Sequence, residues 1–209
     1  MKIAIAGATG LTGKLCLKLL LDHPKVTSVT AIGRRHVGEY HPKLFESLLT
    51  EMQLRESIQV DAFISCLGTT IKQSGSKSAF NAVDLELPTY IAEKLRENGC
   101  QAAAVVSAIG ADSKSSFFYN QTKGRVEEAF KRIGFESLTI LQPSIIDGTR
   151  DEERPGEKIG LKMMKGLSFI FRGPLKNYAP VKAEAIAERL VKSVLSAKPG
   201  ATIIPSADI

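Results

Sequence analysis

Two side chains of this sequence, Tyr119 and Lys123, have the types and the spacing for acid–base chemistry. Residues four apart on a helix share one face, so both side chains would point into the same cleft. A nearby ammonium stabilises tyrosinate and lowers the tyrosine pKa from about 10 toward neutrality, where a phenol can exchange protons. Ser107, at the end of the preceding apolar run, is the third candidate catalytic residue. The alternative interpretation is that these residues have no catalytic role, with Tyr119 packed on the sheet edge and Lys123 a surface charge.

A glycine-rich turn, GATGLTG, occupies residues 7–13 between an apolar run and an amphipathic stretch. Gly7 would permit a tight strand-to-helix turn, Gly10 a close approach to a diphosphate, and Gly13 close packing of the helix on the sheet. The helix start would present unpaired N–H groups to the phosphates. The turn therefore predicts a dinucleotide site, for which the further candidates are Thr9, Leu11 and Thr12. The alternative is a purely structural glycine turn.

A pair of arginines, Arg34 and Arg35, follows the second apolar run, where an NAD-selective site would carry Asp or Glu. Two guanidinium groups can instead bind a 2′-phosphate through paired hydrogen bonds. The sequence therefore predicts NADP(H) in preference to NAD(H). A solvated basic turn is the alternative interpretation.

The elements that would position these residues alternate along the chain. This alternation predicts an α/β fold with a doubly wound, mostly parallel sheet and a small C-terminal substrate-side segment. The 209 residues fit one domain, in which 147–181, rich in Gly, Pro and charge, is a substrate-side insertion. Expected strands are 2–6, 27–32, 47–50, 60–65, 102–107, 138–142 and 201–204, and expected helices are 11–21, 81–98, 117–133 and 183–196.

The composition excludes several classes of protein. With 44% hydrophobic and 24% charged residues the chain can bury a core, and it has no apolar run long enough to span a membrane. No secretory signal is visible, which predicts a cytoplasmic protein. The net charge of +6 comes without a run of five basic residues and with only 6% aromatics, so nucleic acid is not an expected partner.

The three cysteines, Cys16, Cys66 and Cys100, are far apart and form no ligand motif. We expect them to be reduced and structural. The three histidines lie in polar stretches, so no metal site is expected.

The phrases GATGLTG, AIGRR, ISCLGTT, SAIGADSKSSFFYNQTKGRVE and RDEERPGEK extend from the first expected strand to beyond residue 155. In them the sequence resembles the atypical short-chain dehydrogenase/reductases, and within these the Tat-interacting oxidoreductase family and its bacterial relatives. The resemblance implies a Rossmann fold, bound NADP(H) and a poorly defined substrate.

The resemblance also implies roles for particular residues. Ser107 would orient and polarise a substrate carbonyl, and Lys123 would also bind the nicotinamide ribose. The loop with Cys66, Leu67 and Gly68 would pass above the adenine-ribose side. Pro143 and Ile145 would contact the nicotinamide, and these two residues complete the candidate cofactor contacts.

One position departs from the pattern of the family. Many relatives carry a catalytic Asn where this chain reads Val83-Asp84-Leu85. A carboxylate cannot donate a hydrogen bond, so a proton relay through Asp84 is in doubt.

Two functions remain open at this point. The first is an NADP(H)-dependent oxidoreductase that transfers hydride to or from a small carbonyl or alcohol substrate, with Tyr119 as acid and base. The second is a catalytically silent NADP(H)-binding sensor or scaffold. A membrane-surface role for the cation-flanked apolar stretch 162–172 is a minor third interpretation, and we expect no stable membrane association. Self-association into an oligomer is possible on either main interpretation.

Overall fold

The computed structural model describes residues 1–51, 53–54, 57–148 and 178–209, which build a seven-stranded sheet covered on both faces. All of its neighbouring strands pair in parallel, in the order β3-β2-β1-β4-β5-β6-β9. The strands are β1 (Lys2–Ala6), β2 (Ser28–Gly33), β3 (Leu44–Leu48), β4 (Ala62–Ser65), β5 (Ala102–Val106), β6 (Ser137–Gln142) and β9 (Gly200–Pro205). The expected doubly wound α/β fold is confirmed.

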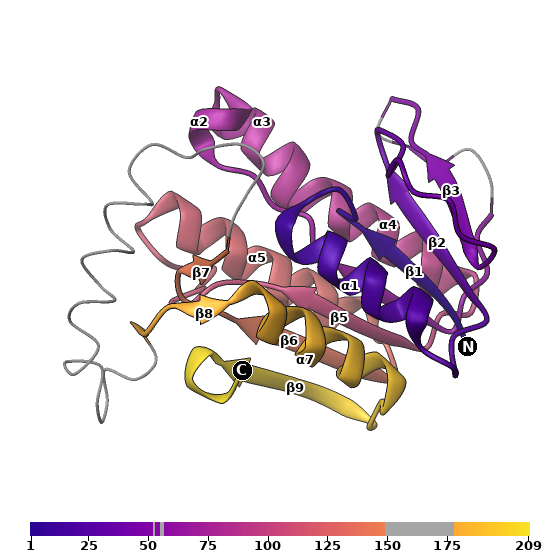
Figure 1. The fold of residues 1–209 in the computed structure, drawn as a ribbon. Coiled ribbons are helices and arrows are strands. Elements are labelled where there is room, and N and C mark those ends of the chain that lie inside the picture. Colours follow the sequence, from indigo (N-terminus) through magenta and orange to yellow (C-terminus); the bar gives the residue numbers. More distant parts are fainter. Residues whose placement is uncertain (52, 55–56, 149–177) are drawn as a thin grey trace.

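Two helical layers enclose this sheet (Figure 1). The helices α1 (Leu11–Asp22) and α7 (Ala183–Leu195) cover one face, and α4 (Leu87–Glu97) and α5 (Phe118–Ile133) cover the other. Each layer buries its own apolar cluster against the sheet. The central strands are buried on both faces and read as unbroken apolar runs, as in the AFIS of β4.

Short elements lie beyond the carboxyl ends of the strands (Figure 1). They are α2 (Ile71–Ser74), α3 (Lys77–Asn81), the π-helical turn η1 (Ala82–Glu86), and the paired strands β7 (Ile146–Asp147) and β8 (Val181–Lys182). The chain ends in the short 3-10 helix η4 (Ser206–Asp208). Ligands of open α/β sheets bind at this edge, so these elements surround the expected site.

Two expected elements differ from the structure. The helix expected over 81–98 is interrupted, because α3 ends at Asn81, η1 follows, and α4 begins only at Leu87. The strand expected at 47–50 is instead β3, which begins at Leu44 and pairs with β2. Most of the expected insertion 147–181 lies outside the described residues.

No helix among the described residues is both long enough and apolar enough to cross a membrane.

Candidate functional site

Two glycines of the glycine turn, Gly7 and Gly13, lie where there is no room for a side chain. Gly7 has φ +83°, and a Cβ there would lie 2.7 Å from the Cys66 carbonyl. A Cβ on Gly13 would lie 2.0 Å from the Gly7 oxygen, so α1 packs directly on the turn. The N-cap residue Gly10 offers no side chain to the first turn of α1, which leaves its N–H groups open to an anion.

A pocket lies between this turn and the end of β2. Arg34 and Arg35 line it and are both exposed, and Thr9 comes from the glycine turn. Its apolar lining residues include Ile32 from β2 and Leu67 from the loop after β4. The pocket thus combines a surface for a flat ring with cations at its rim. Leu11 and Thr12 are the first residues of α1, and Thr12 is buried.

The loop after β4 packs against the turn through Cys66. The Cys66 sulfur lies 3.9 Å from that of Cys16 on α1. The pKa of the Cys66 thiol is raised well above its usual value, first by this hydrogen bond and then by burial. A thiol that keeps its proton is a poor nucleophile, in agreement with a structural role. Gly68 is exposed two residues further on.

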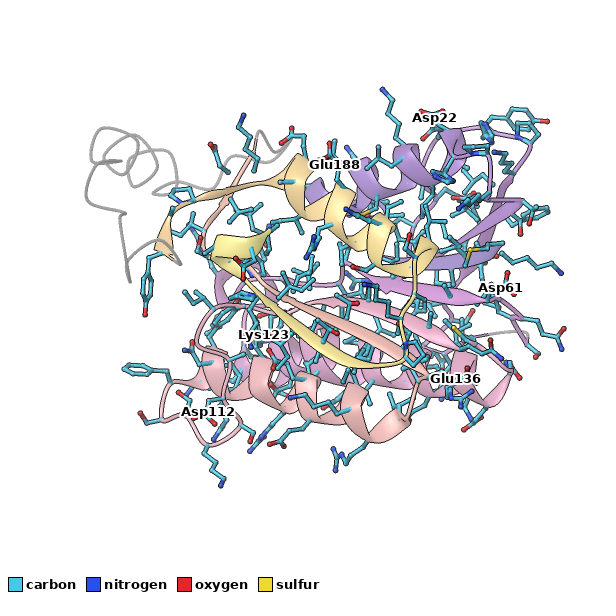
Figure 2. The ribbon with its side chains drawn as sticks, turned by 90° about the horizontal axis from the view of Figure 1, so that it is seen from below. Asp22, Asp61, Asp112, Lys123, Glu136 and Glu188 are labelled. Atoms are coloured by element: carbon cyan, nitrogen blue, oxygen red, sulfur yellow. The ribbon has the colours of Figure 1, made fainter. Side chains whose placement is uncertain are left out.

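One face of α5 carries the candidate acid–base pair. Tyr119 is 40% exposed, whereas Lys123, one turn later, is 4% exposed. Lys123 lies between α5 and the sheet, and Asp112 lies at the outer edge near the start of α5 (Figure 2). In the same view Asp61 and Glu136, which precede β4 and β6, lie at the opposite end of the sheet. The pair therefore belongs to the carboxyl edge.

The Lys123 ammonium is held by an ion pair with Asp84. Its Nζ lies 2.8 Å from Asp84 Oδ1, and both side chains are almost fully buried. The other oxygen, Oδ2, accepts a hydrogen bond of 2.7 Å from the backbone N–H of Thr69. A Cβ on Gly68 would lie 3.7 Å from Asp84 and 3.8 Å from Lys123, so the loop after β4 passes beside both charges. The aspartate that departs from the family pattern is thus a partner of the site lysine.

The segment from α3 to η1 packs against the first turns of α5. Phe80 packs against the ring of Tyr119, with ring centroids 6.0 Å apart. Asn81 accepts a hydrogen bond of 3.0 Å from the Thr122 hydroxyl. Together with the Asp84 ion pair, these contacts hold α3 and η1 against the face of α5 that carries Tyr119 and Lys123.

Ser107 follows β5 directly and is 3% exposed. Its hydroxyl donates a 2.5 Å hydrogen bond to Glu127 Oε1, which also accepts a 2.9 Å bond from Gln142 Nε2. Glu127 is eight residues along α5 from Tyr119, about 12 Å along the helix axis. While this bond holds, Ser107 can meet a substrate oxygen only as an acceptor.

The loop after β6 completes the edge. The Pro143 carbonyl accepts a 2.9 Å bond from the N–H of Ile109, so the ends of β5 and β6 are tied together. Ile145 is 42% exposed, and its carbonyl accepts a bond from Val181 in β8. The structure thus brings the glycine turn, Arg34, Lys123 and this loop to one edge.

Sequence reasoning missed Glu127, Gln142 and the pairing of Asp84. A signal for Glu127 was present, because Tyr119, Lys123 and Glu127 are spaced by four and share one helix face. No comparable signal pointed to Gln142, whose partner comes from a different element.

Comparison with known proteins agrees with this geometry. Residues 2–111 match the family model "Semialdehyde dehydrogenase, NAD binding domain". The solved structure of WbmH from Bordetella bronchiseptica in complex with NAD+ superimposes with a TM-score of 0.71 at 14% identity, over 98% of this chain and 75% of that one. A short-chain dehydrogenase family protein from Francisella tularensis gives a TM-score of 0.64 at 13% identity, over 98% and 97% of the two chains.

Fold and family model together define a Rossmann protein with an NAD-binding domain. Its sequence relatives narrow the assignment. Protein fmp52, mitochondrial, from Emericella nidulans is 32% identical over 95% of this chain and 89% of its own length. Protein HTATIP2 from Rattus norvegicus is 33% identical over 79% and 71%. The chain belongs to the atypical short-chain dehydrogenase/reductase family that includes these two proteins.

The expectation of a cytoplasmic protein is contradicted by the same comparison. Fungal relatives that cover 73% to 100% of this chain are named mitochondrial. The absence of a visible secretory signal, on which that expectation rested, does not distinguish cytoplasm from mitochondrion.

Proposed function

We propose that this protein is an NADP(H)-dependent oxidoreductase acting on a small carbonyl or alcohol substrate. The observation that carries the proposal is that the tightly packed glycine turn and the Tyr119–Lys123 face of α5 lie at one edge of the sheet. The residues fit a dinucleotide, because Gly7 and Gly13 let the turn pack closely against α1 and the loop after β4, and the start of α1 carries no side-chain cap.

In this proposal each residue has one task. The bound cofactor supplies the hydride at its nicotinamide ring. Tyr119, the most exposed member of the set, gives a proton to the substrate oxygen or takes it away. Lys123 supplies positive charge behind the phenol and reaches the nicotinamide ribose, and Asp84 fixes its position. The Ser107 hydroxyl donates its proton to Glu127, so its oxygen can accept a hydrogen bond from an alcohol substrate, whereas a carbonyl oxygen receives its proton from Tyr119.

The test of this chemistry is Tyr119→Phe. It removes the phenolic proton but keeps the ring contact with Phe80. We expect kcat to fall by about a hundredfold or more, since positioned acid–base groups contribute that much, while the Kd for NADPH stays within about twofold. NADPH oxidation against a panel of aldehydes, ketones and quinones provides the assay. Unchanged turnover would exclude Tyr119 from the chemistry.

The preference for NADP(H) is proposed from the two exposed arginines at the pocket rim. Replacing both Arg34 and Arg35 by Ala should weaken NADPH binding by at least tenfold and leave NADH binding nearly unchanged. Calorimetric Kd values for NADPH and NADH, measured on the unmodified protein and on the double variant, test this preference. Equal affinity of the unmodified protein for NADH and NADPH would contradict the preference.

A second candidate is a cofactor-binding sensor without chemistry, and one observation favours it. Lys123 is engaged by Asp84 and the Ser107 hydroxyl by Glu127, so two of the three expected catalytic groups already have internal partners. Tight NADPH binding with no oxidation of any substrate in the same panel would favour this candidate.

A further inference from the structure

Glu127 is a buried carboxylate at the junction of three elements. It projects from α5, is 5% exposed, and receives hydrogen bonds from Ser107 at the end of β5 and Gln142 at the end of β6. Both donors use the same oxygen, Oε1. Both hydrogen bonds are accepted by the carboxyl group, and together they tie α5 to the ends of β5 and β6.

Glu127 has no ion-pair partner within the described parts of the chain, and its two hydrogen-bond donors are neutral. The ammonium of Lys123, one turn earlier on the same face of α5, is instead paired with Asp84 of η1. Because the interior screens charges weakly, the field of Glu127 reaches the adjoining edge of the sheet.

That edge is where the proposed cofactor would place its nicotinamide half. Ligands of this fold lie outside the carboxyl ends of the strands, and Ser107 and Gln142 are the residues at two of those ends. The pocket at the end of β2, where the adenosine half would bind, is three strands away from β5 in the sheet. The carboxyl ends of β5 and β6 are therefore the place where we expect the nicotinamide ring.

We propose that Glu127 is a positioning residue that selects the redox state of the cofactor, an inference that rests on the proposed function. The oxidised nicotinamide ring carries a positive charge and the reduced ring is neutral, while the rest of the two molecules is the same. A fixed negative charge near the place where the ring would bind would therefore strengthen binding of NADP+ relative to NADPH. At the same time Glu127 holds the ends of β5 and β6 at a fixed separation.

The experiment measures one ratio, Kd(NADP+)/Kd(NADPH), by calorimetry on the full chain. A unit charge about 10 Å from the ring, at an effective dielectric constant of 20 to 40, changes this ratio by about 4- to 16-fold. Glu127→Gln keeps the side-chain size and removes the charge, so the ratio should rise by that factor. Glu128→Gln is the matched control, because Glu128 is exposed, is the next residue, and bonds the Ser113 hydroxyl instead. Its ratio should stay within twofold of the unmodified protein.

A second variant covers the case that Glu127→Gln does not fold. Gln142→Lys puts an ammonium beside the intact carboxylate and neutralises it, so the ratio should again rise. Gln142→Leu, which keeps the charge of Glu127, is its control and should leave the ratio unchanged.

The outcomes separate the charge effect from a merely structural role. If Glu127→Gln and Gln142→Lys change the Kd values for NADP+ and NADPH by the same factor, Glu127 has only a structural role and the inference is overturned. If the unmodified protein binds neither cofactor form, the proposed function itself fails, and this inference with it.

Discussion

The ion pair between Lys123 and Asp84 yields the first prediction at the scale of single residues. Asp84→Ala leaves a buried ammonium without its partner and the Thr69 N–H without its acceptor. We expect the free energy of unfolding to fall by about 3 to 5 kcal/mol, as for other broken buried pairs. Urea denaturation followed by circular dichroism measures this loss.

A surface pair provides the control for Asp84→Ala. Lys94 and Glu97 form an ion pair of 2.6 Å on the exposed side of α4. Glu97→Gln should cause no measurable change in stability, because solvent screens exposed pairs. A similar loss in both variants would mean that burial is not what makes the Asp84 pair important.

A second residue-scale prediction concerns Cys100, whose thiol is buried beside the start of β5. Burial raises the pKa of this thiol to about 12 from an ordinary value of 9.0. The folded state therefore keeps a proton that the unfolded chain releases. The stability gained in this way is fully present below pH 9 and is lost progressively as the pH rises from 9 to 12. Between pH 8 and 10 the loss from this group is about 1.4 kcal/mol.

The Cys100→Ala variant isolates this contribution. Urea unfolding at pH 8 and pH 10 should show a decline about 1.4 kcal/mol smaller in the variant than in the unmodified protein. Equal declines in the two proteins would show that the thiol does not titrate differently in the folded state.

Residues on one helix face were predictable from spacing, but their partners were not. The four-residue interval predicted that Tyr119 and Lys123 share a face of α5, and the same interval extends to Glu127. The Asp84 ion pair depends on the π-helical turn of η1, which turns this side chain toward α5. No pattern within a single helix indicates a contact between two helices.

At the scale of elements, the close approach of α5 to the preceding loop gives a further prediction. A Cβ on Gly124 would lie 2.1 Å from the Ser113 N and 2.2 Å from the Asp112 carbonyl carbon. Gly124→Ala must therefore push α5 away from this loop, and the stability should fall by about 1 to 3 kcal/mol. The shift also moves Lys123, so cofactor binding should weaken.

Thermal denaturation and a calorimetric Kd for NADPH test both parts of the Gly124 prediction. Arg125→Ala, at the next and exposed position, is the control and should behave like the unmodified protein. A Gly124→Ala protein with unchanged stability would show that the loop with Asp112 and Ser113 can move aside without destabilising the fold.

The two misplaced elements have physical explanations. Pro88 has no N–H to bond the carbonyl of residue 84, so an α-helix from 81 to 98 would lose a bond where η1 now lies. The strand β3 is at the sheet edge and carries Glu46, which bonds His36 rather than packing in a core. Polar residues of this kind weaken the apolar pattern by which strands are recognised. The central strands, buried on both faces, were located correctly within one or two residues.

At the scale of the whole molecule, the strand order assembles the site from distant parts of the chain. The sheet places β1 between β2 and β4, and β5 between β4 and β6. Residues near positions 10, 34, 66, 107 and 142 therefore meet at one edge, although they are spread over more than half of the chain. The alternation of strands and helices predicts this gathering, because parallel strands end on the same side.

A ligand that binds this shared edge must stabilise the entire fold, which is the last prediction. Binding to the folded state alone adds RT ln(1 + [L]/Kd) to the free energy of unfolding, about 2.7 kcal/mol at a hundred times Kd. For a chain of 209 residues this raises Tm by roughly 5 to 10 °C. NADPH at a hundred times its calorimetric Kd should produce this shift in a thermal melt. NADH at the same concentration should produce a smaller shift, since it lacks the 2′-phosphate for Arg34 and Arg35. If both dinucleotides leave Tm unchanged, the glycine turn does not bind them, and oxidoreductase and sensor are excluded together.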